Sequence, residues 1–84
     1  EARDRLASTG SWQDRSVLAD LLKKSGDMED ADGRIGEAIS AYEESVALRR
    51  EVVDAVPSSA REHRWLWITL EALADCRETR AQRS

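Results

Sequence analysis

Apolar residues recur along most of this chain at the spacing that is typical of α-helices. In a first segment, from about Ser11 to Asp30, the apolar positions lie on one side of a helix and are Leu18, Leu21, Leu22 and Met28. In a second, from about Arg34 to Val56, they recur at spacings of three, four and seven residues and are Ile35, Ile39, Tyr42, Val46, Val53 and Val56. These periods indicate amphipathic helices, so the pattern predicts an all-α fold.

The second predicted helix carries a further stripe beside the first one. The stripe consists of Ala38, Ala41, Ser45, Leu48 and Val52, with its small residues toward one end. Small side chains allow another helix to approach closely. We therefore expect this helix to have neighbours on more than one side.

A third predicted helix follows Pro57, the only proline of the chain, which ends the second helix. Ser59 and Glu62 have the spacing of a capping box at its start. The helix reads "WLWITLEALADC" and is apolar almost all round. Its residues Trp65 and Trp67 point about 200° apart, so one apolar stripe cannot bury both. Either a second layer covers this helix or one tryptophan faces a partner. The polar segment "RETRAQRS", which follows Cys76, is expected to fray.

The segment "GDMEDADGRIGEAIS", residues 26–40, surrounds glycines with carboxylates and could be a calcium loop or a turn. A calcium loop of the EF-hand type requires glycine at position six and glutamate at position twelve. With Gly33 as the required glycine, position twelve is Ile39, and a loop that begins at Asp27 has Asp32 at the glycine position. The pattern therefore favours a turn between two packed helices.

Composition narrows the possible partners. The 84 residues carry a net charge of −4, and 36% of them are charged, with both signs interleaved. Nucleic-acid binding would need a basic patch, so we expect no nucleic-acid partner, and the two glycines of "GRIG" do not change this because their neighbours are acidic. No apolar run approaches the roughly 18 residues of a membrane span, so we expect no membrane association.

The candidate chemistry is sparse. Cys76 is the only cysteine, which excludes an internal disulfide and a C-x-x-C pair, and the simplest role for it is that of a small core residue. His63 is the only histidine and has no catalytic or metal-binding partner at a suitable spacing. We therefore predict no enzyme activity, no cofactor and no metal. A reducing cytoplasm is the expected location, and a chain that begins at Glu1 without a signal peptide is expected to be a piece of a longer protein.

Four residues around the acidic turn have the spacing of a known repeat. A small residue late in the first helix is followed by a turn glycine, a small residue and an aromatic, here Gly26, Gly33, Ala38 and Tyr42. In this the chain resembles the tetratricopeptide repeat (TPR) family. The resemblance implies that the helices cross where Gly26 faces Ala38, that Gly33 makes the tight turn and that Tyr42 fills the space beside the crossing.

The resemblance also implies how the chain is divided. Residues 11–57 form an antiparallel helical hairpin, residues 58–84 form the first helix of a next repeat or a capping helix, and residues 1–10 are the remnant of a preceding repeat helix. A second, degenerate copy aligns "LLKKSGDM" with "TLEALADC", at a spacing longer than the usual period of about 34 residues. The long second helix and the late Pro57 resemble the subgroup that includes kinesin light chains and many bacterial sensor proteins. The expected architecture is a TPR-like α-solenoid fragment.

In that family the first helix of each repeat lines a concave groove that binds partners. The matching positions, with the tryptophan that could face a partner, are Asp20, Lys23, Asp27, Asp30, Trp67, Ile68, Glu71, Asp75 and Glu78. Most of them are acidic, so a basic protein or peptide is the expected partner. Only Lys23 fits the family's clamp for a C-terminal carboxylate, which uses Lys, Arg and Asn.

We therefore predict a protein-interaction scaffold module that binds a peptide or a partner domain through the helical groove. The alternative is a small self-associating helical bundle that serves the assembly or regulation of a larger protein. A chain with one complete repeat leaves apolar surface open at both ends, so we also expect it to form a homo-oligomer.

Overall fold

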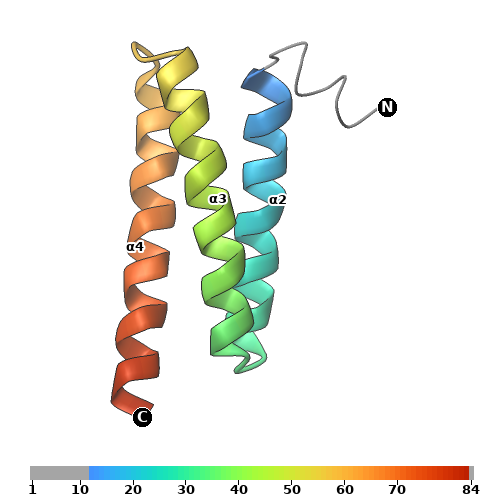
Figure 1. The fold of residues 1–84 in the computed structure, drawn as a ribbon, viewed down its shortest axis with the longest axis vertical. Coiled ribbons are helices and arrows are strands. Elements are labelled where there is room, and N and C mark those ends of the chain that lie inside the picture. Colours follow the sequence, from blue (N-terminus) through green and yellow to red (C-terminus); the bar gives the residue numbers. More distant parts are fainter. Residues whose placement is uncertain (1–11, 84) are drawn as a thin grey trace.

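Three long helices make up the described part of the chain, residues 12–83 of the computed structural model. They are α2 (Trp12–Ala31), α3 (Ile35–Ala55) and α4 (Ala60–Arg83), and consecutive helices run in opposite directions (Figure 1). These residues contain no strand, so the prediction of an all-α fold is confirmed. The expected start of the first helix at Ser11 and the expected helix remnant at 1–10 lie outside the described residues. No helix within 12–83 is long and apolar enough to cross a membrane.

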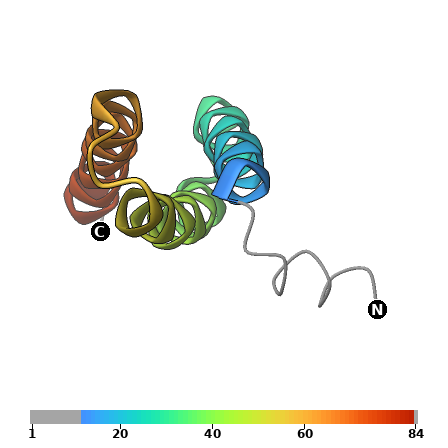
Figure 2. The ribbon, with the colours of Figure 1, turned by 90° about the horizontal axis from the view of Figure 1, so that it is seen from above.

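Helix α3 is the central element, because it packs against both α2 and α4. Seen from above, the three helices form a U with α3 at its base (Figure 2). This confirms the expectation that the second helix has neighbours on more than one side. The buried residues of α3 are Ile35, Ala38, Ile39, Tyr42, Ser45, Val46, Arg49 and Val52.

The turn between α2 and α3 depends on Gly33. Its φ of +81° lies in the left-handed region, where a side chain would strain the backbone. The last turn of α2 closes with the N–H of Gly33 donating to the carbonyl oxygen of Asp30 at 3.0 Å and the N–H of Arg34 donating to Glu29 at 2.8 Å. The acidic segment is thus the end of a helix followed by a glycine turn.

The second connection contains Pro57, which follows two residues after the end of α3. The Oγ of Ser59 accepts a hydrogen bond from the N–H of Glu62 at 3.3 Å, so one half of the predicted capping box is present. The carboxylate of Glu62 binds elsewhere, in a buried cluster described below.

Helix α2 packs on α3 through small residues. Its buried residues are Ala19 and Gly26, and the Oγ of Ser45 on α3 donates to the carbonyl oxygen of Ala19 at 2.7 Å. Most of the apolar side of α2 faces away from the core, with Leu21 57% and Met28 68% exposed.

The crossing of α2 and α3 is filled by the ring of Tyr42. A β-carbon placed on Gly26 would first meet the ring of Tyr42, at 2.6 Å from Cε1 and 2.7 Å from Cδ1. Tyr42 therefore lies directly over Gly26 at the crossing of α2 and α3. Both Ala38 and Tyr42 are buried.

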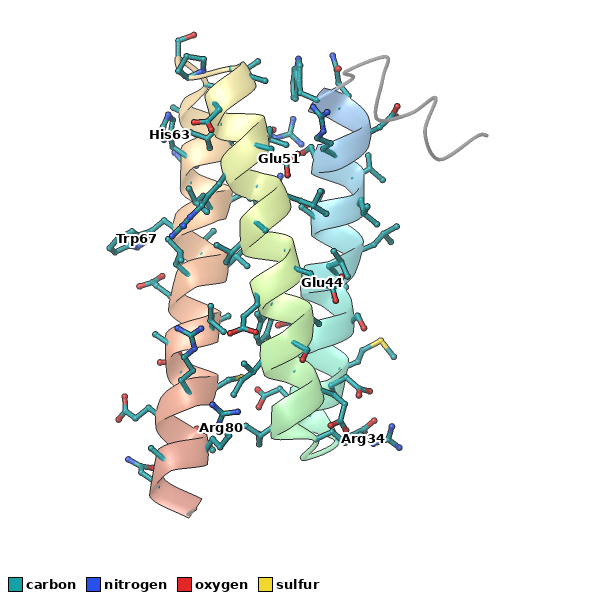
Figure 3. The ribbon with its side chains drawn as sticks, in the orientation of Figure 1. Arg34, Glu44, Glu51, His63, Trp67 and Arg80 are labelled. Carbon is teal, nitrogen blue, oxygen red and sulfur yellow. The ribbon has the colours of Figure 1, made fainter. Side chains whose placement is uncertain are left out.

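Helix α4 is longer than expected, since it continues to Arg83 and the predicted fraying after Cys76 is wrong. The segment "RETRAQRS" contains no helix breaker, and its Arg, Glu, Ala and Gln are good helix formers. Arg77 also forms an ion pair with Glu43 of α3 at 2.7 Å. Of the two tryptophans, Trp65 is partly buried and Trp67 is 63% exposed and points away from α3 (Figure 3).

Candidate partner-binding site

One face of α3 carries two polar side chains that reach the flanking helices. Tyr42 and Arg49 are seven residues apart, which is two helical turns, so they lie on the same side of α3 about 10 Å from each other along its axis. Each contacts α2, and each lies beside residues of α4. We refer to the space between α2 and α4, with α3 as its floor, as the groove.

An open pocket of about 190 Å³ lies in the groove at Tyr42. All three helices contribute to its lining, which consists of Asp27 and Asp30 from α2, Tyr42 from α3, and Ala72, Asp75, Cys76 and Thr79 from α4. Three of these seven residues carry carboxylates, and none is basic. The pocket therefore suits a positively charged group.

Asp27 is fixed in position by two hydrogen bonds. It accepts one from the hydroxyl of Tyr42 and one from the Nζ of Lys23 at 3.0 Å, one turn earlier on α2. Partial burial alone would raise the pKa of Asp27, but these hydrogen bonds and the charge of Lys23 hold the pKa below its ordinary value of 3.8. Asp27 is thus anionic at neutral pH.

Two groups beside Asp27, the Tyr42 phenol and the Cys76 thiol, have raised pKa values. Burial and the hydrogen bond to Asp27 raise the pKa of the Tyr42 phenol well above its ordinary value of 10.0. Burial, followed by the charges of Asp30, Asp75 and Asp27, raises the pKa of the Cys76 thiol as well. Both groups are therefore neutral at neutral pH, and the thiol has little tendency to act as a nucleophile.

The second polar cluster, two turns along α3, is centred on Arg49. The side chain of Arg49 is only 1% exposed, although it carries a full charge. Its Nη1 donates to Oε1 of Glu62 on α4 at 2.8 Å and to the Oγ of Ser16 on α2 at 2.8 Å. Its Nη2 donates to Oδ1 of Asp20 on α2. The guanidinium thus joins all three helices, and its Nε is buried without a hydrogen-bond partner.

This cluster was not predicted from the sequence, although the sequence contains a signal for it. Ile35, Tyr42, Arg49 and Val56 follow one another at intervals of seven residues, so the arginine falls within a stripe of otherwise apolar or aromatic residues. A charge at a buried helical position needs an anionic partner on a facing element. The partners here lie 13 and 29 residues away in the chain, which only the folded structure brings together.

The structure brings together three of the predicted partner-binding residues, Asp27, Asp30 and Asp75, in the pocket. Lys23 lies beside them in an ion pair with Asp27, whereas Asp20 belongs to the Arg49 cluster. The residues Ile68, Glu71 and Glu78 do not line the pocket, and Trp67 points away from α3. Cys76 and Thr79 contribute to the pocket and were not predicted to do so.

Other chemistry within the described residues is limited. His63 is exposed, and its Nε2 lies 2.8 Å from the carbonyl oxygen of Pro57. Among residues 12–83, no group of three or more histidine, cysteine or acidic side chains is arranged to hold a metal ion. The acidic pocket is a candidate binding site.

The comparisons with known proteins return no relative. No protein-family model, no curated protein and no solved structure matches this chain.

Proposed function

We propose that this chain is a TPR-like helical-repeat module that binds a basic protein or peptide partner through the groove between α2 and α4, without catalysis of its own. The observation that carries the proposal is the pocket in which Asp27, Asp30 and Asp75 surround Tyr42 and Cys76. We also propose a reducing, cytoplasmic location, which is compatible with the free thiol of Cys76.

A lysine or arginine side chain of a partner matches the chemistry of this pocket. Carboxylates accept charge-assisted hydrogen bonds, which are roughly twice as strong as neutral ones. Asp30 and Asp75 are exposed, so they can attract a cation from solution before it enters. Asp27 is already bound to Tyr42 and Lys23, which leaves Asp30 and Asp75 as the main acceptors for a ligand.

The packing of two glycines of this chain supports its resemblance to the TPR family. Gly26 provides the space that Tyr42 fills, and Gly33 adopts the left-handed backbone of the turn. The conformation of Gly33 and the position of Gly26 at the helix crossing support the resemblance. The family's mode of binding, in a groove lined by the first helix of each repeat, corresponds to walls formed by α2 and α4.

Titration of fluorescent peptides by anisotropy tests the proposal. We expect lysine- and arginine-rich peptides to bind more tightly than acidic peptides of equal length, and the affinity to fall as salt rises. The double variant Asp30→Asn, Asp75→Asn should weaken binding. The matched control is Glu37→Gln, Glu44→Gln, which removes the same charge from exposed positions on α3 outside the pocket. Equal affinities for acidic and basic peptides would refute the proposal.

A second candidate function, self-association in a larger assembly, is favoured by a different observation. Helix α2 exposes Val17, Leu18, Leu21 and Met28, and α4 exposes Trp67. Apolar residues on these two helices, which flank α3, would let copies of the chain stack on one another, as repeats do in a solenoid. The occupant of the apolar side of α2 would then be a second copy of this chain.

A further inference from the structure

We propose that Arg49 is a positioning residue that sets the separation of α2 and α4, and with it the width of the groove. The proposal rests on the proposed function for its biological meaning, but its structural part can be tested without any ligand. The side chain does not line the acidic pocket. It acts through the helices that carry the pocket.

The geometry of the guanidinium carries the inference. From α3, Arg49 donates to Ser16 and Asp20 on one wall of the groove and to Glu62 on the other. The two walls also meet directly at this point, where the Oγ of Ser16 donates to the carboxylate of Glu62 at 3.3 and 3.4 Å. A planar guanidinium has its donors in a rigid fork, so it holds its acceptors at fixed positions.

Burial makes this link difficult to break. The side chains of Arg49 and Glu62 are 1% and 4% exposed, so neither charge has access to water that could replace its partner. Loss of the contact between Arg49 and Glu62 would leave the Glu62 charge without its cationic partner in the protein interior, which is strongly unfavourable. The interaction of Arg49 with Glu62 therefore restrains the position of α4 relative to α3.

The restraint is close enough to affect the pocket. Asp20 and Asp27 are seven residues apart on α2, and Arg49 and Tyr42 are seven residues apart on α3. Each pair spans about two turns, or about 10 Å, on one face of its helix. Long helices are stiff over this distance, so a change of spacing at Arg49 is transmitted to the pocket between Asp27, Asp30 and Asp75.

The test measures the distance between the walls directly. Spin labels are attached to Lys24→Cys on α2 and Ala74→Cys on α4, both exposed positions, in a Cys76→Ala background, and their separation is measured by double electron–electron resonance. We expect Arg49→Met to broaden the distance distribution and to shift its mean. Arg50→Met, at the adjacent exposed position, should leave the distribution unchanged. An unchanged distribution in the Arg49 variant would overturn the inference.

A second variant keeps the test valid if Arg49→Met does not fold. The double variant Arg49→Met, Glu62→Met removes the link without leaving Glu62 as an unpaired buried charge, and circular dichroism confirms that it is folded. The inference predicts a broadened distribution for it too, and a distribution like that of the parent would overturn it. Titration of the parent with a lysine-rich peptide separates the two proposals: if the parent does not bind, the proposed function fails, while the distances still decide the role of Arg49.

Discussion

Tyr42 lies over Gly26 so closely that a β-carbon on Gly26 would be 2.6 Å from Cε1 of the ring. The same tyrosine donates its hydroxyl to Asp27, the next residue of α2. One aromatic side chain therefore both fills the crossing of α2 and α3 and positions a carboxylate of the pocket. Packing and the candidate binding site are joined at this contact.

The crossing can be tested with two glycine substitutions. Overpacking costs about 1–3 kcal/mol, whereas the helix propensity of alanine returns up to about 1 kcal/mol. We therefore expect Gly26→Ala to lower the free energy of unfolding by about 1 kcal/mol. Gly36, on α3, has nothing within 4 Å of its built β-carbon, so Gly36→Ala should instead stabilise the protein. Urea denaturation measures both, and an equal gain in stability for the two variants would contradict the packing of Tyr42 on Gly26.

The buried cluster makes a stability prediction of its own. Removal of one partner from a buried ion pair typically costs about 3–5 kcal/mol, and we expect Arg49→Met to fall in this range because Glu62 stays buried. The double variant Arg49→Met, Glu62→Met should recover part of the loss, because no charge is left unpaired. Arg50→Met is the control for loss of a positive charge. Chemical denaturation of the two single variants at Arg49 and Glu62 and of the double variant measures the losses of stability. A loss in the double variant equal to the sum of the single losses would contradict the coupling.

The raised pKa values predict a loss of stability at alkaline pH. Cys76 and Tyr42 hold their protons more tightly in the folded protein than in the unfolded chain. The unfolded chain therefore releases these protons first, and the free energy of unfolding should fall as the pH rises past the ordinary values of 9.0 for the thiol and 10.0 for the phenol. The free energy of unfolding is measured by denaturation at several pH values across this range. It should fall less steeply with pH in Cys76→Ala and in Tyr42→Phe than in the parent. The same dependence on pH in both variants and the parent would exclude the effect.

At acidic pH, the free energy of unfolding depends on Asp27, because the pKa of this carboxyl group is lowered in the folded protein. Its contribution is present above the ordinary value of 3.8 and is lost as the pH falls through the folded-state value. Tyr42→Phe removes one of the hydrogen bonds that lower this pKa, so the acid loss of stability should be smaller in that variant. NMR titration of the Asp27 carboxyl carbon measures the pKa directly, and a higher value in Tyr42→Phe is the expected result.

Exposed apolar residues on α2 and α4 predict association that depends on concentration. We expect sedimentation velocity to show a species larger than the monomer as the protein concentration rises, and Leu21→Lys to suppress it. Ser25→Lys adds the same charge at another exposed position of α2 and serves as the control. A single monomeric species at every concentration would argue against self-association.

The helices and their turns were predictable because their signals are local. The hydrophobic period, Gly33 and Pro57 are local features of the sequence. They place the first two helices and the start of the third close to their observed bounds. The end of α4 was predicted wrongly because the polar composition of "RETRAQRS" was interpreted as a sign of fraying. The helix propensity of these residues is nevertheless high, and the helix continues to Arg83. The apolar residues of α2 were grouped on one side, and the resemblance placed the small residue Gly26 at the contact with α3. Neither feature indicates that most of the apolar side is exposed.

The candidate site was predictable only in part, for a physical reason. Asp27, Asp30 and Asp75 were predicted only because the resemblance to a repeat family implies a groove at these positions. The Arg49 cluster depends on three helices meeting at one point, and no local spacing encodes that meeting. Cys76 and Thr79 enter the pocket for the same reason, because α4 turns these residues toward Tyr42 and the end of α2.

The binding of a basic ligand in the groove is tested most directly by NMR chemical-shift mapping of the ¹⁵N-labelled protein with a lysine-rich peptide. The account predicts saturable shifts that concentrate at Asp27, Asp30, Asp75, Cys76 and Thr79 and that disappear in the variant Asp30→Asn, Asp75→Asn. Shifts that are absent, or that concentrate instead on the exposed residues Val17, Leu21 and Met28 of α2, would contradict it.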